Sequence, residues 1–116
     1  MRGYALIEHA VEQAHQSGLR ITRAAFVREA GRVVGVCWVG AILLQHGHER
    51  LDPGWLPIFL DILGKDSYFF WRYNCGFCHG VRRMTYIVER DGKDVHVSDE
   101  VSRRGFALAK KYGLYR

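Results

Sequence analysis

The sequence of 116 residues contains little proline and no low-complexity tract. Its two prolines exclude a fibrous or linker-like chain, in which proline and glycine would dominate the composition. Hydrophobic residues make up 48% and charged residues 25%, which are globular proportions and exclude a disordered chain. Because this length suits one typical domain, we expect a single globular domain over residues 1–116.

Long apolar runs are also absent. The longest, residues 33–44, has twelve residues between Arg32 and Gln45, whereas a membrane-spanning helix needs about 20. Near the N-terminus, Glu8 and Glu12 interrupt the apolar stretch that a signal peptide would require. We therefore expect a cytoplasmic protein that has no membrane partner.

Hydrophobic periodicity predicts an α+β fold in which two antiparallel hairpins pack with four to five helices. Glycine-containing connectors place the hairpins at residues 25–36 and 84–97, and Asp91-Gly92 is a strong type I′ turn signal in the second. Helices are expected near residues 4–17, 37–46, 54–63, 67–75 and 99–112. We expect the hairpins to form or contribute to a sheet that is packed by these helices, and the apolar faces of the first and last helices to lie on that core.

Two segments are ambiguous between helix and strand, and two helix starts are marked by capping residues. Residues 37–45 and the aromatic segment 68–73 suit a strand as well as a helix, because short apolar runs have no decisive period. Asp52-Pro53 is typical of a helix start, with Asp52 as the N-cap. Pro57 leaves open the alternative that the regular helix begins only there. Asp99, or Ser98 before it, is expected to cap the last helix.

The sharpest motif is Cys75-Gly76-Phe77-Cys78-His79. Taken literally it is the attachment pattern of a c-type haem, which requires maturation outside the cytoplasm. Cys75 and Cys78 also suit half of a tetrahedral zinc site. The other ligands would then come from Cys37, His46, His48 or His79. The interpretation that we favour is structural, with both cysteines as small buried hydrophobes beside a glycine-rich turn and with no cofactor, zinc being the alternative.

Nothing in the sequence indicates an enzyme. It has no phosphate-binding glycine loop, no paired-carboxylate signature and no serine-centred elbow. Cys37 with His46 or His48 would make a nucleophile and its base. However, the neighbours Val36 and Trp38 predict that Cys37 is buried, and apolar burial makes a thiol inert. We therefore expect a protein without catalytic activity.

Positive charge is concentrated in the predicted C-terminal helix. Four cations fall in one stripe about 100° wide, on the side opposite the apolar residues Val101, Leu108 and Tyr112. The members of the stripe are Arg103, Arg104, Lys110 and Lys111. Such a stripe suits the phosphate backbone of a nucleic acid or an acidic protein, although cations also stabilise the C-terminal end of a helix.

Three more arginines, Arg72, Arg82 and Arg83, lie in or near the aromatic segment. The aromatic residues among these cations, Tyr68, Trp71 and Tyr73, would add base stacking in single-strand recognition. Together with the stripe, these residues predict a small non-enzymatic interaction or regulatory module with a protein partner. The alternatives are a nucleic-acid-binding protein and a zinc-stabilised module.

Two stretches resemble a family of small bacterial and phage domains of unknown function. Cys37-Trp38-Val39-Gly40-Ala41 is similar to the Cys-x-x-Gly-Ala helix start of that family. Residues 63–67, the aromatic segment and the helix that begins near Glu100 are similar to its second half. The resemblance covers about half the chain, implies no activity and assigns no functional residue.

Overall fold

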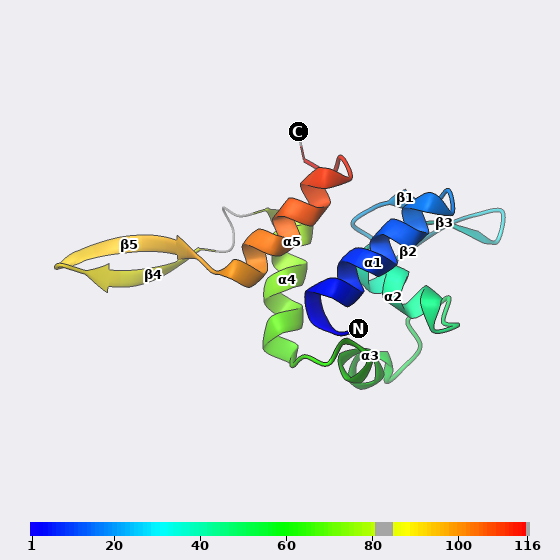
Figure 1. The fold of residues 1–116 in the computed structure, drawn as a ribbon, viewed down its shortest axis with the longest axis horizontal. Coiled ribbons are helices and arrows are strands. Elements are labelled where there is room, and N and C mark those ends of the chain that lie inside the picture. The colour runs from blue at the N-terminus through cyan, green and yellow to red at the C-terminus, as the bar shows by residue number, and fades with distance from the viewer. Residues whose placement is uncertain (81–84, 116) are drawn as a thin grey trace. The chain divides into compact units, whose positions relative to one another are not determined.

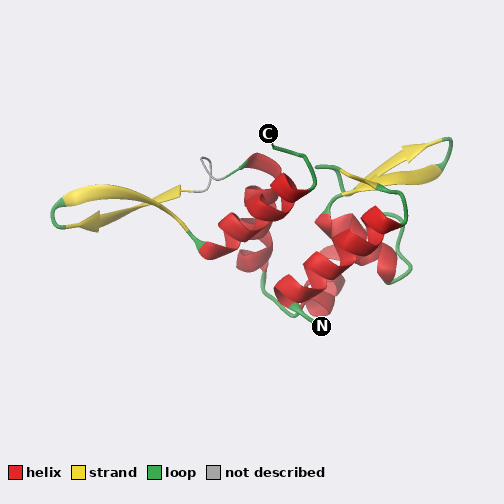
Figure 2. Cartoon of the chain, turned by 45° about the horizontal axis from the view of Figure 1, so that its top comes forward, coloured by secondary structure: helices red, strands yellow, loops and turns green. Residues whose placement is uncertain are grey.

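The computed structural model describes residues 1–80 and 85–115, apart from the side chains of residues 85–88 and 95–98. This part of the chain forms five helices and two small sheets, which confirms the α+β prediction (Figure 1, Figure 2). The chain divides into two compact units, Met1–Asp66 and Ser67–Arg116. The single domain over residues 1–116 stays a prediction. No helix in the described residues is long and apolar enough to cross a membrane.

Three helices form the core of the first unit. They are α1 (Gly3–Gln16), α2 (Trp38–Gln45) and α3 (Trp55–Leu63). The apolar face predicted for the first helix is buried, and α1 packs mainly against α2. The side chains at the centre of this unit are completely buried, namely Ile7, Val11, Trp38, Ile42, Phe59 and Leu63. The segment that the sequence left ambiguous, residues 37–45, is therefore a buried helix, with Cys37 as its N-cap.

The first hairpin is part of a three-stranded sheet. It consists of β2 (Phe26–Glu29) and β3 (Arg32–Val36), which confirms the hairpin predicted at residues 25–36. The short strand β1 (Arg20–Ile21) pairs in parallel with the other side of β3. The sequence did not predict β1, because a strand of two residues has no readable alternation.

The N-cap predicted at Asp52 is wrong. Helix α3 begins at Trp55, and its N-cap is Gly54, which has a φ of 82°. Pro57 explains the later start. If Pro53 were the first helical residue, Pro57 would be the fifth and would have to donate an intrahelical hydrogen bond that proline cannot make. With the start at Trp55, Pro57 is the third helical residue, where no such bond is needed.

The second unit contains α4 (Ser67–His79), β4 (Thr85–Arg90), β5 (Lys93–Ser98) and α5 (Glu100–Lys111). Strands β4 and β5 form the second predicted hairpin, with Asp91-Gly92 as its turn. This hairpin is a separate two-stranded sheet. The last helix, α5, crosses α4 and packs mainly against it rather than against a sheet (Figure 1).

Candidate interaction surface on the C-terminal helix

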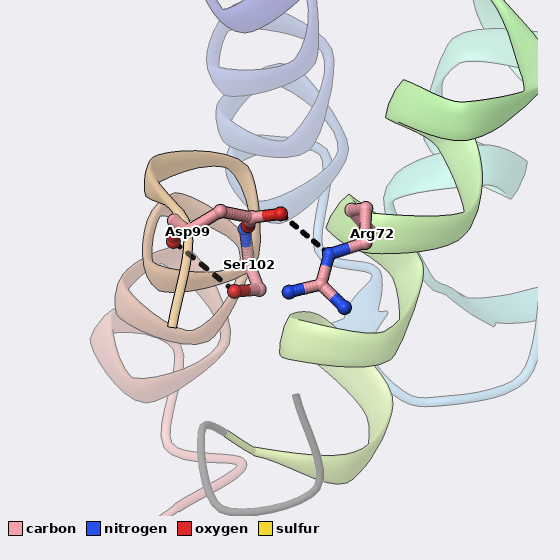
Figure 3. A network of polar contacts seen from close by, with 3 residues as sticks. All are labelled: Arg72, Asp99 and Ser102. Atoms are coloured by element: carbon pink, nitrogen blue, oxygen red, sulfur yellow. Dashed lines mark hydrogen bonds and ion pairs between the residues drawn. The ribbon is translucent and has the colours of Figure 1, made fainter. Parts of the chain in front are cut away.

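The start of α5 is fixed by a side-chain cap. Asp99 is the N-cap, and its Oδ1 accepts a hydrogen bond of 2.8 Å from the backbone N–H of Ser102. The Ser102 hydroxyl donates to the backbone carbonyl of Asp99 at 3.1 Å (Figure 3). These bonds satisfy groups that a helix end otherwise leaves without partners. The sequence correctly predicted Asp99 as one of two possible caps.

The second carboxylate oxygen of Asp99 binds Arg72 on α4. The Nε of Arg72 lies 2.5 Å from Oδ2 of Asp99, and Figure 3 shows both residues at the helix crossing. The Arg72 side chain is 6% exposed and that of Asp99 is 18% exposed. Arg72, a predicted binding residue, therefore lies inside the contact between α4 and α5. The aromatic segment that contains Arg72 is part of helix α4, and Arg72 lies on the side of α4 that packs against α5.

The environment of Asp99 favours its charged form. Burial raises the pKa of this carboxyl group, but the hydrogen bonds from Ser102 and Arg72 and the charge of Arg72 lower it by more. The pKa of Asp99 consequently lies below its usual value. The Asp99–Arg72 pair is thus an ionised contact that joins the start of α5 to α4.

Small residues allow the two helices to approach closely. A Cβ added at Gly76 of α4 would lie 1.9 Å from the backbone oxygen of Ser102, and one added at Gly105 of α5 would lie 2.3 Å from that of Tyr73. Neither site has room for a side chain. Ser102, Gly105 and Ala109 recur on one face of α5, and all three are buried. This pattern of small residues was visible in the sequence and was missed there.

The cap and the close crossing set the rotation of α5 and leave its charged side outward. All four cations of the predicted stripe are exposed, namely Arg103, Arg104, Lys110 and Lys111. We call them the α5 stripe. Two further exposed residues, Glu100 and Ala107, lie on the same side of the helix. Oε1 of Glu100 forms an ion pair with Nη1 of Arg104 at 3.9 Å. Leu108 is buried and Val101 and Tyr112 are half-buried, as the predicted wheel requires.

The aromatic residues that were predicted to stack on bases lie on α4 and not on α5. Tyr68 and Trp71 on α4 are 58% and 53% exposed, whereas Tyr73 is buried. Trp71 is rotated about 140° around α4 from Gly76, which marks the side against α5. Trp71 and the α5 stripe therefore do not share a face. Arg82 and Arg83 lie outside the described residues.

The Cys-x-x-Cys-His motif lies in the second half of α4. The prediction that the two cysteines lie beside a glycine-rich turn is therefore wrong. Helix α4 continues through Gly76 to His79, and the missing side chain of Gly76 leaves room for the backbone of α5. Cys75 and Cys78 are half-buried free thiols, and Cys78 donates to Oδ1 of Asn74 at 3.4 Å. Burial raises the pKa of Cys75, which the charge of Arg72 opposes in part. A raised pKa disfavours the thiolate that a metal or a redox partner requires.

The other proposed zinc ligands are found in the first unit. His46 is exposed, with its Nδ1 3.0 Å from the carbonyl oxygen of Ile42, and His48 is half-buried. Cys37 is buried, and its sulfur accepts a hydrogen bond from the N–H of Val39. Across residues 1–80 and 85–115 as described, no three His, Cys, Asp or Glu residues gather closely enough to hold a metal ion. Zinc stays a prediction, which elemental analysis of the purified protein can check.

The surface that the sequence and the fold both single out is thus the α5 stripe. No protein family, curated protein or solved structure matches the chain. The resemblance to small bacterial and phage domains stays a hypothesis, and no argument below rests on it.

Charge is distributed unequally between the two units. Residues 1–66 contain seven Lys and Arg and seven Asp and Glu, whereas residues 67–116 contain ten Lys and Arg and five Asp and Glu. The formal net charge of +5 therefore belongs entirely to the unit that contains the α5 stripe. An excess of one sign in one half of a chain indicates attraction to a polyanion.

Proposed function

We propose that this chain is a small non-enzymatic interaction module and that the α5 stripe binds the acidic surface of a protein partner. The observation that supports this most is the outward orientation of four cations on a helix whose rotation is fixed by buried contacts. Oriented charges on a rigid element steer encounter with a complementary surface and set the register of the complex. The hydrophobic face of α5 contributes to the fold and the charged face to binding.

The second candidate is binding to a nucleic-acid duplex. Arg103 and Arg104 precede Lys110 and Lys111 by seven residues, which is about 10.5 Å along a helix. Because a duplex carries one negative charge per about 1.7 Å of its axis, two cation pairs at this separation can contact separate phosphates. Single-strand recognition is less well supported, because Trp71 faces away from α5.

A titration with two polyanions separates the candidates. Labelled polyglutamate represents an acidic polypeptide, and a labelled 20-base-pair DNA represents a phosphate backbone. The protein-partner proposal predicts saturable binding of polyglutamate and no duplex binding at physiological salt. The nucleic-acid candidate predicts duplex binding that weakens steeply as salt rises.

A variant with all four stripe cations replaced by glutamine tests the location of the site. Under either candidate, the replacement of Arg103, Arg104, Lys110 and Lys111 abolishes binding while circular dichroism stays unchanged. Binding of either polyanion that survives this replacement would contradict the proposal. Failure of the unchanged protein to bind both polyanions even at low salt would contradict it as well.

A further inference from the structure

A small apolar pocket lies in the first unit, beside the loop that joins α2 to α3. Its volume is about 120 Å³, and its apolar walls are Leu43, Pro53, Trp55 and Ile58. The half-buried His48 and two exposed charged residues, Arg50 and Asp52, complete the lining. A cavity of roughly 150 Å³ holds a benzene-sized guest, so this pocket suits one branched aliphatic side chain.

Large apolar side chains are exposed around the pocket. Ile58 in its wall is 52% exposed. Leu51, which is 45% exposed, lines a neighbouring hollow that shares Arg50 with this pocket. Exposed aliphatic residues beside an apolar hollow are typical of an interaction surface. Because Arg50 lines both hollows, an apolar side chain that can be inserted lies next to a pocket of matching size.

The charges on this patch complement each other. Arg50 and Asp52 have opposite signs and flank Leu51, and neither forms an ion pair with any residue that the structure describes. In a twofold contact centred near Leu51, Arg50 of one copy would oppose Asp52 of the other, and the reverse pair would form by symmetry. Residues 1–66 have no net charge, so two such units do not repel each other through their overall charge.

We propose that a second copy of this chain covers the pocket. Leu51 of each copy fills the pocket of the other, and two Arg50–Asp52 ion pairs flank the apolar centre. This contact is isologous, which is the commonest form of association between identical chains. It uses only the first unit and is independent of the binding proposed for the α5 stripe.

Sedimentation equilibrium of the full chain, with the charge variants Arg50→Asp and Asp52→Arg, tests this contact. The unchanged protein is expected to dimerise at concentrations below about 1 mM. Each variant alone places like charges opposite each other at both ion pairs, so its dissociation constant rises at least about tenfold. An equimolar mixture of the two variants places acidic side chains opposite basic ones again, and we expect it to form a one-to-one heterodimer.

Three controls make the result specific. Arg32→Asp makes the same charge change at an exposed position of the β2–β3 hairpin and should leave dimerisation unchanged. Leu51→Asp should abolish dimerisation, and the quadruple glutamine variant of the α5 stripe should dimerise like the unchanged protein. The proposal is overturned if the unchanged protein stays monomeric or if the mixed variants fail to associate. It is also overturned if the stripe variant loses dimerisation, because the contact would then involve α5.

Discussion

At the scale of single residues, Asp99 stabilises both the start of α5 and the contact of α5 with α4. One carboxylate oxygen accepts the capping hydrogen bond from Ser102, and the other pairs with the buried guanidinium of Arg72. An arginine that is 6% exposed requires a charged partner, because burying an unpaired charge is very unfavourable. The position of α5 therefore depends on the negative charge of Asp99.

Replacing Asp99 with asparagine tests this charge, because asparagine also caps helices well but has no charge. We expect Asp99→Asn to lower the free energy of unfolding at pH 7 by about 2 kcal/mol. The folded-state pKa of Asp99 is lowered, so its stabilising effect is complete above the unfolded value of about 3.9 and disappears as pH falls through the folded pKa. Urea unfolding should therefore show the two proteins converging as the pH falls below about 4.

The control for this variant is Asp52→Asn, at the residue that the sequence wrongly indicated as a helix cap. Asp52 is exposed and does not cap α3, so its replacement should change the free energy of unfolding by less than about 0.5 kcal/mol. A difference between the Asp99 variant and the unchanged protein that stays constant from pH 7 to pH 3 would contradict the assignment.

A second residue-scale prediction concerns Ala30 in the turn of the first hairpin. Ala30 has a φ of 51° and Gly31 a φ of 77°, whereas the other hairpin has the favourable pair Asp91-Gly92 at its turn. A left-handed conformation costs an alanine about 1–2 kcal/mol. Glycine avoids this strain but increases the entropy of the unfolded chain, so Ala30→Gly should stabilise the protein by about 0.5–1 kcal/mol.

Thermal unfolding measures this gain, and Ala24→Gly provides the comparison. Ala24 is also exposed and lies in the same region, but its φ is negative. Glycine there relieves no strain and should destabilise the protein by about 0.5 kcal/mol. Equal effects of the two substitutions would show that the strain at Ala30 is not significant.

At the scale of elements, the α4–α5 contact depends on the absence of side chains at two positions. Gly76 and Gly105 each face backbone atoms of the other helix, which cannot move aside as a flexible side chain can. In an exposed helix, alanine is more favourable than glycine by about 1 kcal/mol. The crossing should reverse that preference.

We expect Gly76→Ala to lower the free energy of unfolding by about 2–3 kcal/mol, since overpacking exceeds the gain in helix propensity. Gly105→Ala should act in the same direction. Ala107→Gly on the exposed side of α5 is the matched control and should cost about 1 kcal/mol through propensity alone. Denaturant titration of the three variants checks this order, and a stabilising effect of Gly76→Ala would contradict the close crossing.

The stripe itself leads to a prediction about salt dependence under the nucleic-acid candidate. Replacing Lys110 and Lys111 with glutamine removes about two phosphate contacts, each of which contributes about 0.9 to the slope of log affinity against log salt. The slope should therefore fall by about 1.8, while stability changes little because both side chains are exposed. A slope that does not change would place the phosphate contacts outside these lysines.

At the scale of the whole molecule, the sequence predicted local elements better than their pairing. The hairpin at Asp91-Gly92 and the cap at Asp99 follow from neighbouring residues, and both are confirmed. The parallel pairing of β1 and the burial of Arg72 depend on residues far away in the chain. No local period encodes such contacts. The cationic side of α5 was predictable because helix spacing alone places it opposite Leu108.

The unequal distribution of charge between the units leads to the last prediction. Arg23 and Arg32 in the first unit and Arg103 and Arg104 in the second are all exposed, so replacing either pair with glutamine reduces the net charge equally. If binding depended on net charge alone, both double variants would lose the same affinity for a polyanion. Because charges separated by more than about 8 Å are screened at physiological salt, we expect a local effect. The Arg103 and Arg104 variant should bind at least about tenfold more weakly, and the Arg23 and Arg32 variant should bind within about twofold of the unchanged protein. Fluorescence anisotropy with the polyanion that binds in the titration measures both values, and equal losses would show that the α5 stripe is not the binding surface.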